Sequence, residues 1–131
     1  MNDIVHPPGW PKPRGYSQAI AASGRHVFVA GQIGWNPLDG RFPSTRLHEQ
    51  VRQALENIVT ILAAAEARPE HIVRMTWYVT SRAEYLAEAK EIGAAYRAVI
   101  GKHFPAMAVV EVRALVESEA QVEIEATAVV P

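Results

Sequence analysis

Side chains that could take part in chemistry occur in three short stretches of the sequence. Tyr16 offers a phenolic donor, and Gly31 lets a ligand approach the backbone because it lacks a Cβ. Glu123 offers a carboxylate that could orient a water and accept its proton. Each has a structural alternative: Tyr16 as a packed aromatic, Gly31 as a turn or bulge glycine. Glu123, with Glu125 beside it, could equally belong to a solvated strand face or a salt bridge at a subunit contact.

The remaining residues do not favour a metal site or a catalytic nucleophile. The sequence has no cysteine, which excludes disulfides, thiolate nucleophiles and thiolate metal sites. Its five histidines do not occur at metal-binding spacings such as HxxH or HExxH. Ser17 follows Tyr16, but no histidine and acid pair that could activate it is recognisable. We therefore expect no metal site and no serine-hydrolase triad.

Composition is that of a globular protein and does not favour a nucleic-acid or a membrane partner. Of 131 residues, 49% are apolar and 21% charged, which suits one folded domain. The net charge is −1 and the basic side chains are scattered, so a nucleic-acid partner is not expected. No apolar run approaches the ~20 residues of a membrane span, so no membrane partner is expected either. The first residues lack the apolar core of a secretory signal; with no cysteine, this favours a cytoplasmic location.

Hydrophobic periodicity predicts the main elements. Apolar residues three and four apart predict helices over residues 47–65, with Ser44 or Thr45 as the cap, and over 82–100. Alternation or enrichment in β-branched and aromatic residues predicts strands over the following ranges: 16–22, 26–31, 72–80, 106–112 and 121–130. Gly24 lies between the first two of these strands, which predicts a β-hairpin.

The order β-β-α-β-α-β-β indicates an α+β fold. One mixed β-sheet with two helices packed on one face is the economical way to bury the apolar faces of these elements. Residues 1–15 are rich in proline and glycine and are predicted to form an extended N-terminal arm. Residues 16–131 are predicted to form a single domain.

Four segments, in this order, resemble the RidA family, also called YjgF or L-PSP. They are GYSQA (Gly15–Ala19), VFVAGQI with the following NP and G (Val27–Gly40), QVRQALENI (Gln50–Ile58), and EV with the later VEIEATAVV (Glu111–Val112 and Val122–Val130). The resemblance implies a chorismate-mutase-like fold and a homotrimer. It also implies clefts between subunits in which a small imine or enamine is hydrolysed to a carbonyl compound and ammonia, without metal or organic cofactor.

The resemblance also implies which residues form the site. Tyr16 matches the tyrosine of the family's PYSQ-like motif, and Glu123 matches the first glutamate of its EIEA motif; both are the expected catalytic residues. The family's SGQ turn, which binds substrate, corresponds to Ala30, Gly31 and Gln32, with alanine in place of the serine.

Met107 departs from the family pattern. It lies in FPAM, where the family has an arginine that holds the substrate carboxylate, and the family's helix asparagine has no counterpart in residues 86–90. A guanidinium offers a planar fork of donors to two carboxylate oxygens, whereas a thioether offers no donor and no charge. Loss of such a pair in a partly dry cleft costs about 2–5 kcal/mol. We therefore expect weak binding of the family's amino-acid-derived imines.

Two explanations for the altered site remain open. Arg14, two residues before Tyr16, could fold over the cleft and replace the missing guanidinium. Alternatively, the pocket could take an uncharged or aromatic ligand, with Met107, Trp35 or Trp77 as an apolar wall.

These observations leave three functional hypotheses. The first is a RidA-like hydrolase, similar to 2-iminobutanoate/2-iminopropanoate deaminase, with a substrate preference altered by Met107. The second is a non-catalytic trimer that binds or senses a small ligand in the same inter-subunit clefts. The third is a ribonuclease activity, which is attributed to some relatives. A near-neutral chain without a basic patch gives this hypothesis little support.

Overall fold

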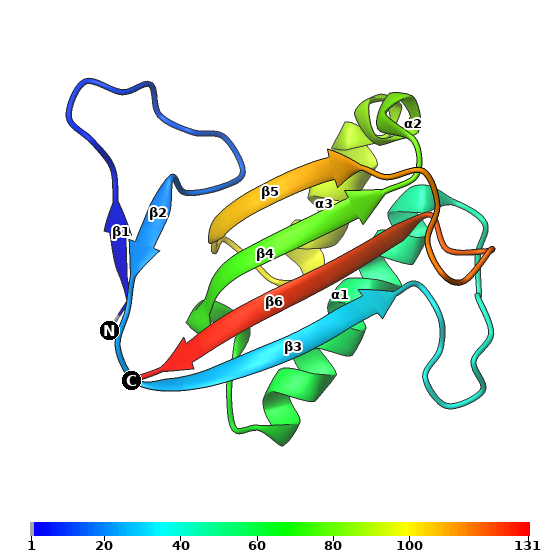
Figure 1. Cartoon of the computed structure of the whole chain (residues 1–131), viewed down its shortest axis with the longest axis horizontal. Coiled ribbons are helices and arrows are strands. Elements are labelled where there is room, and N and C mark those ends of the chain that lie inside the picture. The colour runs from blue at the N-terminus through cyan, green and yellow to red at the C-terminus, as the bar shows by residue number, and fades with distance from the viewer. Residues whose placement is uncertain (1) are drawn as a thin grey trace.

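The computed structural model describes residues 2–131 and is built on one four-stranded sheet (Figure 1). The strand order is β3-β6-β4-β5, with β3 and β5 at the edges. Their bounds are Arg25–Ile33 for β3, Ile72–Val79 for β4, Ala106–Glu111 for β5 and Val122–Val130 for β6. β4 and β5 run parallel, and the other neighbours run antiparallel. The expected mixed sheet is confirmed.

Both long helices cover the same face of this sheet (Figure 1). α1 is Leu47–Ala64 and α3 is Ala89–Val99, joined to the strands through the short helices α2 (Arg82–Ala87) and η1 (Pro69–His71). The apolar stripe of α1 is fully buried against inward-facing strand residues, because alternate residues of β4 and β6 point toward the helices. No helix within residues 2–131 is long and apolar enough to cross a bilayer. The α+β class predicted from periodicity is confirmed.

The predicted hairpin is wrong. β2, Ala19–Ala21, pairs with β1, Asp3–Val5, in a separate two-stranded sheet, so the N-terminal arm supplies the partner. Gly24 explains why the chain does not fold back on itself. A Cβ at Gly24 would lie 2.2 Å from the carbonyl oxygen of Val130, so this residue passes close to the end of β6 and leads directly into β3.

The second predicted helix is interrupted at Glu88, which separates α2 from α3. Glu88 Oε1 accepts hydrogen bonds from the backbone N–H of His48 (3.0 Å) and from its ring Nδ1 (2.6 Å). The carboxylate therefore satisfies a free N–H in the first turn of α1, a role predicted for Ser44 or Thr45. Instead, Ser44 donates its hydroxyl to Glu49 and the N-cap residue, Arg46, makes no side-chain cap bond.

Gln50 is a buried amide that fixes the loop leading into β6. Its Nε2 donates to the carbonyls of Ser44 (3.1 Å) and Glu119 (3.0 Å), and its Oε1 accepts from the N–H of Gln121 at 2.8 Å. Gln50 is 1% exposed, so no water replaces these bonds easily. The start of β6, and hence the position of Glu123, depends on this side chain.

Replacement of Gln50 by leucine should lower the free energy of unfolding by about 1–3 kcal/mol, because buried backbone groups lose their partners. Urea denaturation at fixed protein concentration measures the change. Gln18→Leu, at an exposed position, is the matched control and should change stability by less than about 0.5 kcal/mol. Equal midpoints for the two variants would show that Gln50 does not fix this loop.

Candidate functional site

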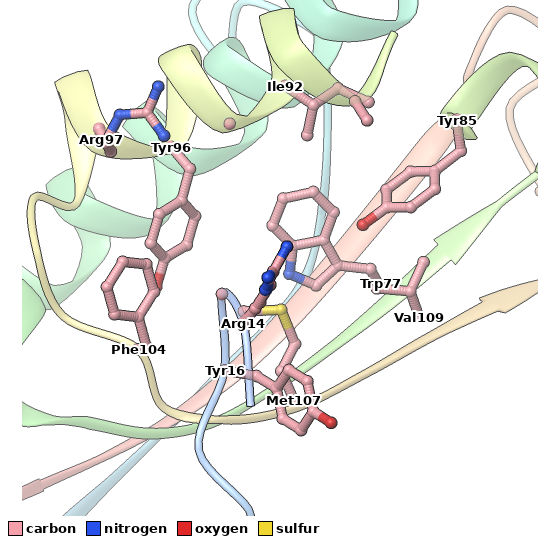
Figure 2. Close-up of a pocket in the computed structure, with 13 residues that line it drawn as sticks. Arg14, Tyr16, Trp77, Tyr85, Ile92, Tyr96, Arg97, Phe104, Met107 and Val109 are labelled. Carbon is pink, nitrogen blue, oxygen red and sulfur yellow. The ribbon is translucent and has the colours of Figure 1, made fainter. Parts of the chain in front are cut away.

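A pocket of about 350 Å³ lies between α3 and the strands β4 and β5 (Figure 2). Trp77 of β4 and Met107 and Val109 of β5 point into it because they lie on the helix-facing side of the sheet, where Val109 is the register partner of Trp77 and Met107 that of Met75. The space exists because α3 presents two small residues here, Ala89 and Gly93, which leave the helix and the strands apart. The pocket is therefore a product of packing between the two layers.

The N-terminal chain closes one side of this pocket through Ser17. The N–H of Ser17 donates to the carbonyl of Pro105 at 3.0 Å, and its hydroxyl donates to the carbonyl of Phe104. Ser17 also forms a parallel bridge with Ala106, so the loop is attached to the start of β5. Gly15 has φ +78°, a left-handed conformation that turns the chain back over the pocket.

This attachment brings three of the sequence-predicted residues together. Arg14, Tyr16 and Met107 all line the pocket (Figure 2). Arg14 lies on the N-terminal loop, and Met107 lies on β5, which this loop covers. The explanation in which Arg14 replaces the missing guanidinium requires this arrangement. Trp77 lines the same pocket, whereas Trp35 lies outside it and packs on Phe42 with ring centroids 6.1 Å apart.

The electrostatic character of the pocket is positive. Arg14 and Arg97 line it, and no aspartate or glutamate does. Neither guanidinium makes a hydrogen bond or a salt bridge with any other residue in the described range 2–131. Apolar and aromatic side chains make up the rest of the wall, so any charge on a ligand would lie beside a low-dielectric surface.

Two tyrosines in the wall are held neutral. The hydroxyl of Tyr96 donates to the carbonyl of His103 at 2.6 Å, and its ring stacks on Phe104 with centroids 5.9 Å apart. Burial raises the pKa of Tyr96 and of Tyr85 above the ordinary value for a phenol. Both side chains therefore present a neutral aromatic ring with a polar hydroxyl group. The Tyr96 hydroxyl proton is already used in the hydrogen bond to His103.

The other predicted residues lie on β3 and β6. Val29 pairs with Ala126 and Gln32 pairs with Ile124, so Ala30 and Gly31 form a β-bulge between them. A Cβ at Gly31 would lie 2.1 Å from Oε2 of Glu123. The Glu123 carboxylate thus lies directly against the backbone of the bulge, a contact that only glycine permits.

The two glutamates of the last strand differ in what they contact. Oε1 of Glu125 accepts a hydrogen bond from the Tyr78 hydroxyl at 2.6 Å, and this bond raises the pKa of Tyr78. Glu123 makes no hydrogen bond or salt bridge within residues 2–131. Glu125 is therefore occupied, and Glu123 is free to bind a water or a ligand.

The two groups of predicted residues do not meet within one chain. Met107 lies opposite the buried Met75, on the helix-facing side of the sheet. Glu123 lies opposite Tyr78, on the face that the helices leave open. Because alternate residues of a strand point to opposite faces, the sheet separates the pocket from the Glu123 carboxylate.

The sequence analysis missed most of the pocket wall, including its aromatic and charged members Tyr85, Tyr96, Arg97 and Phe104. The stripe that predicted the second helix included Tyr96 only as a core residue. The signal that could have indicated a cavity was the pair Ala89 and Gly93 on the same stripe, since small side chains on a packing face leave volume. No group of three or more His, Asp or Glu side chains in the described chain is arranged to hold a metal ion.

Known proteins similar to this chain match almost its whole length. The family model described as Endoribonuclease L-PSP matches residues 11–130. A RutC family protein of Pyrococcus horikoshii is 37% identical over 98% of each chain. The 2-iminobutanoate/2-iminopropanoate deaminase of Homo sapiens is 32% identical, over 87% of this chain and 79% of its own. The crystal structure of YyfB from Yersinia pestis, a Rid family protein of unknown function, has a TM-score of 0.83 at 34% identity and 98% coverage of each chain. The chain therefore belongs to the RidA/YjgF family, as its motifs indicated.

Proposed function

We propose that this protein is a homotrimer that hydrolyses a small imine or enamine to a carbonyl compound and ammonia, in clefts between its subunits. The observation that carries the proposal is the free Glu123 carboxylate against the Gly31 bulge, in the motif where the family has its catalytic glutamate. Similarity to the human 2-iminobutanoate/2-iminopropanoate deaminase supports this reaction class. We propose a cytoplasmic location, for which the absence of cysteine is the support.

The sheet face that the helices leave open is the proposed site of contact between subunits. Phe28 of β3 is 77% exposed and Val110 of β5 is 43% exposed on this face. These two apolar side chains lie on the two edge strands of the uncovered face, and exposed apolar surface of this kind favours burial against another chain. In a closed trimer, the pocket of one subunit with Arg14 and Tyr16 would meet Glu123 of its neighbour, which one chain alone cannot arrange.

The proposed chemistry needs one water and one base. Glu123 orients a water and accepts its proton as the oxygen attacks the carbon of the C=N bond. The proton then passes to the nitrogen, the C–N bond breaks, and ammonia leaves as the C=O bond forms. Tyr16 donates a hydrogen bond to the substrate, and the backbone at Ala30–Gln32 lines the opposite side of the cleft.

Met107 gives the reason for a changed substrate preference. It contributes a half-buried thioether to the pocket where relatives with the P-A-R motif have a guanidinium. Small amino-acid-derived imines carry little apolar surface, so their affinity depends on their charge. The same loss of an anchor suits the second candidate, a ligand-binding trimer without turnover, which saturable binding of imines without release of ammonia would support.

Glu123→Gln should lower kcat by about 10²–10⁴-fold, because the amide cannot accept the proton from water. Ammonia release from an imine generated in situ measures the loss. Glu125→Gln is the matched control on the same strand face, and it should retain activity because Glu125 is already bonded to Tyr78. A fully active Glu123→Gln variant would exclude Glu123 as the base.

Met107→Arg should raise kcat/KM for 2-iminopropanoate by about tenfold or more, because a guanidinium adds a charge-assisted bond to the carboxylate. Met107→Leu is the control for side-chain volume and should leave this activity low. Equal activity in the wild type and Met107→Arg would place the carboxylate anchor elsewhere, with Arg14 as the first residue to test.

Phe28→Asp should convert the trimer to single chains, because the variant puts a charge on the proposed contact face. Light scattering coupled to size-exclusion chromatography measures the mass. Val116→Asp is the control, since Val116 is fully exposed in the loop before β6 rather than on the sheet face. A wild-type mass of one chain would contradict the proposed assembly.

A further inference from the structure

Trp77 carries a buried hydrogen-bond donor that the fold does not use. The side chain is 2% exposed, and its Nε1 finds no hydrogen-bond partner among the described residues. A buried indole N–H normally has an acceptor, since an unpaired one costs about 1–3 kcal/mol. The indole lines the pocket, and Figure 2 shows its nitrogen on the side of the ring turned toward Arg14, Tyr16 and Met107. An acceptor placed in the pocket on this side would satisfy it.

Arg14 indicates that the acceptor for the Trp77 N–H is an anion. Its side chain lines the same pocket and has no hydrogen bond or salt bridge within residues 2–131. A guanidinium and an indole N–H are both donors only, so neither can satisfy the other. Because no carboxylate of the described residues lines the pocket, one negatively charged ligand group would provide an acceptor for both donors.

The rest of the wall favours a planar aromatic group. The rings of Trp77 and Tyr96 lie 6.3 Å apart, and those of Trp77 and Tyr85 lie 6.5 Å apart at an interplanar angle of 82°. Aromatic surfaces at these angles contact a further ring by offset stacking or edge-on approach. The pocket volume of about 350 Å³ is near the lower limit for small-molecule sites, which run from about 300 to 1,000 Å³. One ring system with a short acidic arm suits this space.

We propose that the pocket between α3 and β4–β5 binds an aromatic carboxylic acid, whose carboxylate accepts hydrogen bonds from Trp77 Nε1 and the Arg14 guanidinium and whose ring packs against the aromatic wall that Trp77, Tyr85 and Tyr96 form. Met107 then contacts the ring through its sulfur, a favourable contact that an arginine would not supply. This inference rests on the proposed function for its consequence: the substrate is the imine of an aromatic acid rather than that of a short aliphatic one.

The position of the charge explains why the pocket would select against short acids. On β5, position 107 presents an apolar side chain, so the positive charge comes from the N-terminal loop instead. A short acid that reaches Arg14 leaves the aromatic wall uncovered, and an uncharged aromatic compound leaves both donors unpaired. Only a molecule that combines ring and carboxylate satisfies both parts of the site.

Binding to the intact protein tests the proposal with three stable probes. 3-Phenylpropanoate has both ring and carboxylate, propanoate has the carboxylate alone, and 4-phenyl-2-butanone has the ring without the charge. Isothermal titration should give a Kd for 3-phenylpropanoate at least about tenfold lower than for either other probe. Similar Kd values for 3-phenylpropanoate and propanoate would overturn the proposed aromatic selectivity.

The indole N–H of Trp77 supplies a direct readout. The chain has three tryptophans, and Trp77→Phe identifies which indole N–H resonance belongs to Trp77 in a ¹H–¹⁵N spectrum. In the wild type, 3-phenylpropanoate should shift this resonance downfield, as a new bond to a carboxylate requires, and should leave the Trp10 and Trp35 resonances unchanged. An unshifted Trp77 resonance at saturation would overturn the assignment, and this measurement does not depend on the stability of a variant.

Arg14→Gln tests the second donor at an exposed position, where the fold is not at risk. The variant should weaken 3-phenylpropanoate binding by about tenfold and leave 4-phenyl-2-butanone binding unchanged. Arg113→Gln, the same change in the exposed loop after β5, is the matched control and should not alter either Kd. Unchanged binding in Arg14→Gln would contradict the role of Arg14.

These outcomes separate the inference from the proposed function, because binding of the stable probes and release of ammonia are measured independently. Aromatic-acid binding with the expected Trp77 shift, in a protein that releases no ammonia from any imine, would support the inference and contradict the hydrolase. Ammonia release from imines without preference for the aromatic acid would support the hydrolase and overturn the inference.

Discussion

The alternation of side chains across the central sheet is the constraint on which this structure depends. Met75, Trp77 and Met107 share the face that the helices cover, and Glu123 and Tyr78 share the face that they leave open. The covered face supplies the core and the pocket, while the open face supplies the free carboxylate and exposed Phe28. One chain thus carries the two groups of predicted site residues on opposite faces of its sheet. This separation is the physical reason for proposing that catalysis belongs to an assembly of subunits.

The pocket depends equally on a small buried contact at the start of β5. Ser17 attaches the N-terminal loop to the start of β5 through bonds to Pro105 and Phe104, and only this attachment places Arg14 and Tyr16 beside Met107. The proposed anchor, Arg14, lies on a loop rather than on a rigid strand, and this position bears on how the cleft would recognise a ligand. A strand arginine is held by the sheet, whereas Arg14 can adjust to ligands of different length.

Much of the fold could be predicted from the sequence, because α1 and the strands β4, β5 and β6 each carry a strong periodic pattern of their own. The predictions of secondary structure were wrong where a local sequence pattern competes with a contact between segments distant in the sequence. Gly24 suggested a turn, but its approach to Val130 directs the chain into β3. Glu88 read as part of a continuous helix, but its carboxylate is used at the first turn of α1. The pocket wall was predicted only in part, because the volume between two layers depends on how closely they pack, which no single segment specifies.

The bulge at Ala30–Gly31 has a consequence for how chains of this protein associate. β3 is an edge strand, and an edge with a regular ladder of free N–H and C=O groups can add strands from other molecules without limit. The extra residue interrupts that ladder, while the other edge, β5, is partly covered where Ser17 bridges to Ala106. Both edges of the sheet thereby carry a local feature that hinders the unlimited addition of strands from other molecules.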